Sequence, residues 1–242
     1  LQPIKKLHYG ICGKNVDLIN HKIIKSDLTA KKSKINNLNY LEITNTNPIA
    51  DVIPEDFIPY SYIPFSTWHI STFNSWKELK IWANQLFNSN KYNEKLVNEL
   101  VIKYKSESRN VEEYLTKVTQ YVQNEIYYKS ETSGIYNYKP RNPSEVIKKK
   151  YGDCKDKSIL LCALINGYGI DAFPVLVHSN LRENIVDYLP SSNMFDHCIV
   201  KVQYGNRVKF IDPTLSKQGG WFFSKYCPNY RLGLVLFDNS TS

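Results

Sequence analysis

The sequence lacks several features that define common classes of protein. No apolar run among its 242 residues approaches the roughly 18 residues of a membrane-spanning helix, so we expect no transmembrane segment. The five cysteines are odd in number and none stands in a Cys-x-x-Cys arrangement, which argues against a disulfide framework and a zinc site. Arginine-rich runs and basic residues interleaved with aromatics are also missing, so the net charge of +8 predicts solvated basic faces and no nucleic-acid partner.

The length and composition are those of an ordinary globular protein. The chain is long enough for one large domain, or for one domain and a smaller piece. Hydrophobic residues make up 42% and charged residues 22%, so we expect a core that needs no disulfide or metal to fold. Leu1 is not followed by a charged and then apolar leader, and we expect any signal peptide to have been removed.

Residues 1–66 differ from the rest and predict a strand-bearing N-terminal segment. Short β-like runs occur at Lys14–Ile19 and Leu38–Ile43. A connection without regular structure is expected after them, because prolines are dense at Pro48, Pro54, Pro59 and Pro64. The segment is either complete or the tail of a larger domain.

Helix-start signals dominate the part of the chain that follows. Apolar residues recur at helical spacing behind each signal, which predicts amphipathic helices that pack on a common core. The signals are Ser75 with Glu78, a second helix over about 93–106, Asn110 with Glu113, and Asn142 with Pro143 and Glu145.

A cysteine at an expected helix start is the first candidate for chemistry. Asp153 is a good N-cap, which places Cys154 in the first turn of a helix that continues through the apolar run Ile159–Ile165. The positive helix end and the unpaired backbone N–H there favour a thiolate. Cys162 lies inside the same apolar run, so we expect an unreactive core residue there.

A base and an acceptor for the base follow downstream in predicted strands. Residues 170–177 and 195–202 read as strands, and the turn residues 205–206 return the chain as a partner strand that ends at Asp212. A nucleophilic cysteine needs a base, and the base needs an acceptor that fixes its tautomer. With a two-residue turn, His197 and Asp212 become diagonal neighbours on one face, while Asp196 points away.

The three sequence blocks around these residues resemble the motifs of a known superfamily. Gly-Asp-Cys-Lys-Asp-Lys-Ser, Phe-Asp-His-Cys-Ile-Val and Ile-Asp-Pro-Thr, in this order, are similar to the motif blocks of the transglutaminase-like superfamily. More narrowly, they resemble bacterial members in which a β-rich N-terminal domain precedes the core. The resemblance implies an α+β, papain-like core in residues 67–242, with helices packed on a twisted antiparallel sheet.

The resemblance also implies a reaction and its residues. Cys154 is the implied nucleophile, His197 the base and Asp212 the residue that orients the base. The implied activity is acyl transfer on peptide or protein amide bonds through a thioester, without a metal or organic cofactor. The Cys154 N–H is one expected oxyanion donor, and the second is Gln123 or Tyr128, of which we prefer Gln123. The resemblance further favours an exported or periplasmic location.

Three alternatives remain open at this point. Lys155 and Asp156 stand where animal transglutaminases have bulky apolar residues, which favours hydrolysis over transamidation. A protein-binding module without activity could keep the same fold. An amidase that acts on a glycan–asparagine linkage is the third possibility.

Overall fold

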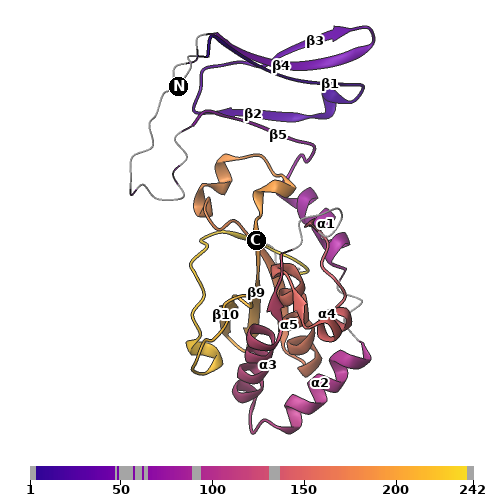
Figure 1. Cartoon of the computed structure of the whole chain (residues 1–242), viewed down its shortest axis with the longest axis vertical. Helices are drawn as coiled ribbons and strands as arrows, with labels where there is room; N and C mark the ends of the chain where they lie inside the picture. Colours follow the sequence, from indigo (N-terminus) through magenta and orange to yellow (C-terminus); the bar gives the residue numbers. More distant parts are fainter. Residues whose placement is uncertain are drawn as a thin grey trace. The chain divides into compact units, whose positions relative to one another are not determined.

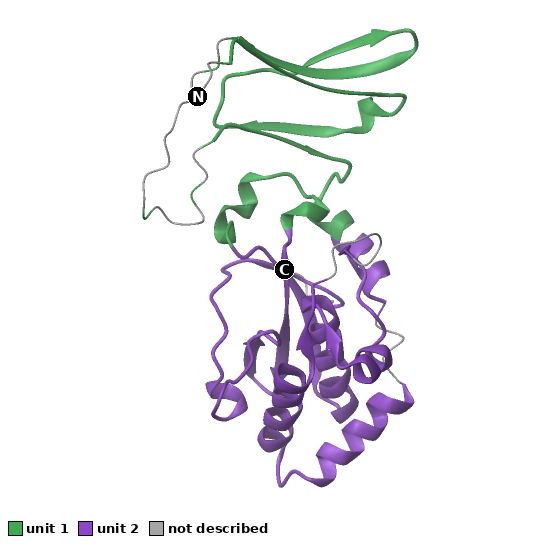
Figure 2. Cartoon of the chain, viewed as in Figure 1, with its two compact units in different colours: residues 1–79, 180–194 green, residues 80–179, 195–242 purple. Residues whose placement is uncertain are grey.

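The computed structural model describes residues 4–46, 48, 57, 62, 65–88, 94–130 and 137–238. Two compact units are present (Figure 2): residues 1–79 with 180–194 form the first, and residues 80–179 with 195–242 form the second. The division of the chain into domains 1–66 and 67–242 stays a prediction. Within the described ranges, no helix is long and apolar enough to cross a membrane.

The first unit is built from two antiparallel sheets. β4 (Leu38–Thr46) pairs with β1 (Lys6–Gly13) on one side and with β3 (Lys31–Ile35) on the other. β2 (Asn20–Ile24) pairs with β5 (Thr67–Ser71) in a separate two-stranded sheet. The strand-bearing character predicted for this part of the chain is confirmed.

The strand prediction is wrong for one of the two β-like runs. The structure has a turn and a short 3₁₀ helix (Val16–Leu18) where we expected a strand over Lys14–Ile19. The chain reverses here between β1 and β2, and Val16 is buried by this turn, so its apolar character reflects burial in a corner. The run Leu38–Ile43 lies in β4, as predicted. Of the predicted proline-rich connection, Pro54, Pro59 and Pro64 lie outside the described residues.

Residues 180–194 belong to the first unit although they connect two strands of the second. They contain 3₁₀ helices at Arg182–Asp187 and Ser192–Met194. The backbone N–H of Leu189 donates to His69 Nδ1 at 3.0 Å, and the Ser71 hydroxyl donates to the carbonyl of Pro190. These hydrogen bonds attach the excursion to β5.

Helices of the second unit begin where the sequence signals predict. The helices of this part of the chain are α1 (Trp76–Phe87), whose first turn falls in the first unit, α2 (Lys95–Ser106), α3 (Val111–Glu125), α4 (Pro143–Lys149) and α5 (Cys154–Tyr168). The Ser75 hydroxyl accepts from the N–H of Glu78 at 3.1 Å, and Asn110 Oδ1 accepts from the N–H of Glu113 at 2.9 Å. Each cap satisfies a backbone donor that the first helical turn leaves without a partner.

The second unit contains a four-stranded antiparallel sheet in the order β10-β9-β8-β11. Its strands are β8 (Asp171–Val177), β9 (His197–Tyr204), β10 (Arg207–Ile211) and β11 (Gly233–Val235). Tyr204 lies opposite Arg207 and Val200 opposite Ile211, which confirms the register predicted from a two-residue turn. Gly205 takes φ of +56°, a conformation that such turns require and that glycine adopts without strain.

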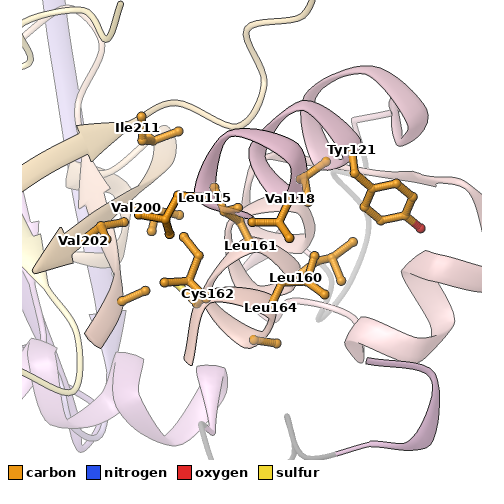
Figure 3. Packing of buried hydrophobic residues seen from close by; sticks show 14 of the residues in the cluster. Leu115, Val118, Tyr121, Leu160, Leu161, Cys162, Leu164, Val200, Val202 and Ile211 are labelled. Atoms are coloured by element: carbon orange, nitrogen blue, oxygen red, sulfur yellow. The ribbon is translucent and has the colours of Figure 1, made fainter. Parts of the chain in front are cut away.

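α5 is the central element of this unit. It packs on β8 and β9 and also contacts α2, α3 and α4 (Figure 1). Figure 3 shows the resulting core, in which residues of α5, α3 and the sheet meet. Its members include Leu115, Val118, Leu160, Leu161, Leu164, Val200, Val202 and Ile211. Burial from all sides explains why residues 159–165 are uniformly apolar, and it fixes the position of the helix start. The predicted α+β class is confirmed.

Candidate active site

Cys154 is the first residue of α5 and is 7% exposed. Asp153 caps the helix, because its carboxylate accepts from the N–H groups of Lys155 at 2.9 Å and Asp156 at 3.1 Å. The Asp156 carboxylate in turn accepts from the Asp153 N–H at 3.1 Å, which completes a capping box. The N–H of Cys154 therefore stands at the positive end of a 15-residue helix, where it has no intrahelical acceptor.

The turn before Cys154 is held by a buried ion pair. Arg141 donates to Asp156 Oδ2 through its guanidinium and to Oδ1 through its backbone N–H, both at 2.6 Å. Burial, and then the charge of Asp153, raise the pKa of Asp156. Gly152 packs so closely that a Cβ built there would lie 2.6 Å from the Cβ of Asp156. Cys154 thus follows a tightly packed turn.

His197 and Asp212 meet as the predicted register requires. His197 Nε2 donates to Asp212 Oδ2 at 2.8 Å. The other carboxylate oxygen accepts from the backbone N–H of Thr214 at 2.9 Å and from its hydroxyl at 2.7 Å. Burial would raise the pKa of Asp212, but the hydrogen bond and charge of His197, together with the Thr214 bonds, outweigh it and lower that pKa. Asp212 is therefore an anion, and hydrogen bonds to both of its carboxylate oxygens fix its orientation.

The imidazole of His197 connects this carboxylate to the thiol of Cys154. Burial would lower the pKa of His197, but hydrogen bonds to Asp212 and to Cys154 outweigh it and raise that pKa to about 10. Because Nε2 faces Asp212, Nδ1 is the ring nitrogen left for the thiol. The structure therefore brings together all three side chains that the sequence singled out.

The two candidate oxyanion donors occupy different places. Gln123 is 2% exposed, and its side-chain nitrogen donates to the Asp212 carbonyl at 3.0 Å and to Gln218 Oε1 at 3.3 Å. The side-chain amide of Gln123 thus already has two acceptors, the Asp212 carbonyl and Gln218 Oε1. Its role as an oxyanion donor stays a prediction. Tyr128 lies beside Cys154: burial, and then the charge of Cys154, raise the pKa of its phenol.

The position of Tyr128 follows from a short parallel pairing. β6 (Tyr127–Tyr128) runs alongside β7 (Tyr151–Gly152), with Tyr128 opposite Gly152. The N–H of Lys129 donates to the Gly152 carbonyl at 3.0 Å. This pairing places the backbone of Tyr128 next to the turn that precedes Cys154, and Tyr128 remains the other candidate for the second donor.

Tyr230 is a contact of the triad that the sequence did not predict. Its hydroxyl donates to Asp212 Oδ2 at 2.9 Å, and its ring centroid lies 5.6 Å from that of His197. Tyr230 lies in an irregular stretch before β11, and no motif surrounds it in the sequence. The local sequence therefore does not predict its contact with Asp212. It also lines a cavity of about 550 Å³ on the sheet face that carries Val175, Val177 and Ile199.

The other sulfur atoms of this unit differ from Cys154 in their surroundings. Cys162 and Cys198 are buried, and burial raises the pKa of both thiols, that of Cys162 well above its usual value. This confirms the prediction that Cys162 is a core residue. Asp196 accepts from the N–H and hydroxyl of Ser179 at 2.7 and 2.6 Å, which gives its carboxylate a partner other than His197.

The thiol at the start of α5 thus lies beside an imidazole that is hydrogen-bonded to a buried carboxylate, on an α+β scaffold. The family model described as the Transglutaminase-like superfamily matches residues 95–223, which include all three side chains. The chain belongs to this superfamily, as its motif blocks predicted.

Three solved structures are similar to this chain at low sequence identity, and the first of them shares its fold. A candidate protease from Parabacteroides distasonis is 16% identical and superposes with a TM-score of 0.70 over 86% of this chain and 40% of its own. A candidate cysteine protease from Cytophaga hutchinsonii is 13% identical, with a TM-score of 0.35 over 88% of this chain and 68% of its own. A TGase is 16% identical, with a TM-score of 0.38 over 85% of this chain and 47% of its own. The chain thus spans less than half of the Parabacteroides protein, and no curated protein matches the sequence.

Proposed function

We propose that this protein is a cysteine-dependent acyl-transfer enzyme that acts on peptide or protein amide bonds. Cys154 is the nucleophile, His197 the acid and base, and Asp212 the residue that orients the imidazole. The observation that carries the proposal is the position of His197: it hydrogen-bonds to the buried carboxylate of Asp212, and that carboxylate and the thiol of Cys154 raise its pKa against the effect of burial. We place this activity in residues 67–242, with residues 1–66 as an appended strand-bearing segment.

The acylation step uses the proton that His197 holds. The Cys154 thiolate attacks the amide carbonyl carbon, and the carbonyl electrons move to oxygen. When the C–N bond breaks, the imidazolium of His197 gives its proton to the leaving amine, and a thioester with Cys154 remains. Asp212 stabilises the imidazolium until that transfer, which is why its lowered pKa matters: it stays an anion throughout.

The negative oxygen that forms during attack needs donors that are already in place. The backbone N–H of Cys154 at the positive helix end is the first donor, and the phenol of Tyr128 is the second that we propose. The raised pKa of Tyr128 keeps this phenol protonated at neutral pH, as a donor must be.

Water is the acceptor that we propose for the thioester. His197, now neutral, takes a proton from water as it attacks the thioester carbonyl, and the C–S bond breaks to release the acid and the thiolate. The polar pair Lys155 and Asp156, directly after Cys154, favours this outcome. Both residues are engaged at the helix start, Lys155 with Asp153 at 2.5 Å and Asp156 with Arg141 at 2.6 Å, so neither forms an apolar wall for an amine substrate.

Activity profiling with electrophilic peptide-like and glutamine-like probes tests the proposal. The native protein should form a covalent adduct at Cys154, and Cys154→Ala should form none. Cys12→Ala is the matched control, because Cys12 is an exposed thiol of the first unit and its loss should leave labelling unchanged. Labelling of Cys12 and Cys154 at equal rates would refute a catalytic thiol.

A further inference from the structure

The carboxylate of Asp212 is filled by four donors, two on each oxygen. Thr214 supplies both donors to Oδ1, at 2.9 and 2.7 Å. His197 and Tyr230 share Oδ2, at 2.8 and 2.9 Å. An ionised carboxylate offers about four lone-pair sites, so this set saturates it. Because Asp212 is only 1% exposed, bulk water does not readily take the place of a hydrogen-bond donor that its carboxylate loses.

We propose that Tyr230 is a positioning residue of this site, which acts on His197 through the oxygen that both residues share. The inference rests on the proposed function, because it concerns the proton that His197 holds. Three of the four donors come from residues that the motifs of this site contain; Tyr230 comes from a separate segment 18 residues beyond Asp212.

The hydroxyl of Tyr230 limits how strongly Asp212 holds the imidazolium. Two donors on one oxygen compete for its charge, so each hydrogen bond is weaker than it would be alone. With Tyr230 in place, His197 gives up its proton more readily to a leaving amine. Without it, Asp212 Oδ2 would act on His197 alone, and the imidazolium would become a poorer acid.

The surroundings of Tyr230 keep it in this role. Burial, and then the charge of Asp212, raise the pKa of its phenol, so the hydroxyl remains a donor over the working pH range. The ring packs at 50° to that of His197 and against buried Val175, Val177 and Ile199. Backbone hydrogen bonds from the Tyr230 N–H to Pro228 at 3.1 Å and from the Leu232 N–H to Tyr230 at 2.8 Å order the segment around it.

The test is the pKa of His197, measured by NMR of its ring in a Cys154→Ala background. Removal of the thiol leaves Asp212 as the principal partner, and no substrate is needed. Tyr230→Phe keeps the ring and removes only the hydroxyl, so the pKa of His197 should rise by roughly half a unit to one unit. An unchanged pKa of His197 would overturn the inference.

Two further variants separate the possible failures. Tyr114→Phe is the control, because it removes a buried tyrosine hydroxyl that does not contact Asp212. That hydroxyl donates to the Leu164 carbonyl at 2.6 Å, and its loss should leave the pKa of His197 unchanged. Asp212→Asn should lower that pKa. If Asp212→Asn has its effect and Tyr230→Phe has none, only the role of Tyr230 is wrong. If Asp212→Asn also has no effect, the proposed triad itself fails.

Discussion

The guanidinium of Arg141 and the carboxylate of Asp156 form a buried ion pair at 2.6 Å, within one helical turn of Cys154. The same carboxylate accepts from the backbone N–H of Asp153 and of Arg141 itself. The Asp156 side chain thus joins Arg141, which lies two residues before α4, to Asp153, the N-cap of α5. The pair holds a functional turn in place, and its energetic weight can be measured.

Loss of Arg141 should destabilise the protein strongly. Arg141→Met keeps much of the side-chain volume but leaves the Asp156 carboxylate buried beside Asp153 without its cation. Removal of one partner of a buried pair typically costs about 3–5 kcal/mol, and we expect the free energy of unfolding to fall by about 3 kcal/mol in urea titrations.

An exposed ion pair of the neighbouring helix is the matched control. Lys149 and Glu145 lie 2.5 Å apart, with side chains 42% and 39% exposed. Lys149→Met should change stability little, because water replaces the lost partner. Equal losses in the two variants would show that burial does not set the cost.

Alkylation should single out Cys154. Cys154 lies at a helix start beside the imidazole of His197, which can take the thiol proton as an electrophile reacts. With iodoacetamide at neutral pH, Cys154 should be modified faster than exposed Cys12 and far faster than buried Cys162. Mass spectrometry of timed samples gives the three rates. The catalytic reading loses its physical basis if Cys12 reacts first.

Stability should depend on pH through His197. Its pKa is raised from the usual 6.5 to about 10, so the folded protein holds a proton that the unfolded chain releases between these values. The stabilisation from this group is complete below about pH 6.5 and is lost as the pH rises through about 10. Asp212→Asn lowers the pKa of His197 and should remove most of this dependence. Urea unfolding of both proteins at several pH values checks this, and parallel curves would contradict it.

The same Asp212→Asn variant should lose most of its activity. The imidazole would keep its place but lack the anion that stabilises its charged form, and general acid–base catalysis contributes about 10²–10⁴-fold. We expect acylation by the peptide-like probe to slow by about 100-fold or more. A variant with near-native rates would assign the acid–base role elsewhere.

Partition of the thioester should favour water. With a glutamine-bearing protein as substrate, ammonia release in the absence of added amine should exceed incorporation of a fluorescent amine. The prediction follows from the ionic groups at positions 155 and 156, where animal transglutaminases have bulky apolar residues. A faster incorporation of amine would identify a transamidase instead.

Local chemistry explains how much of this site the sequence predicted. Asp153, Asn110 and Ser75 are caps whose effect is confined to one helical turn, and a two-residue turn sets the register of the strands that carry His197 and Asp212. Interactions of this kind involve residues close in the chain, so the sequence alone is enough to predict them.

Long-range pairing accounts for what the sequence did not predict. Tyr230 reaches Asp212 from an irregular segment, and no residue next to it in the sequence marks it. Tyr128 was one of two candidates, but the two-residue parallel bridge that places it opposite Gly152 could not be predicted from its neighbours. The strand predicted over Lys14–Ile19 is wrong for a related reason. The sequence alone does not distinguish a valine that is buried in a turn, as Val16 is, from a valine that is buried in a strand.

The two-residue turn at Gly205 sets the register of the two strands that carry His197 and Asp212. Side chains alternate between faces along β9 and β10, so the length of this loop decides whether Asp212 or Ile211 shares a face with His197. The turn lies eight residues along β9 from His197, roughly 25 Å at 3.3 Å per residue. A deletion of one residue there would touch none of the site's side chains. It would nevertheless place Ile211, in place of the Asp212 carboxylate, on the same face as the His197 imidazole. The chemistry of this protein therefore depends on the exact length of a distant, solvent-exposed turn.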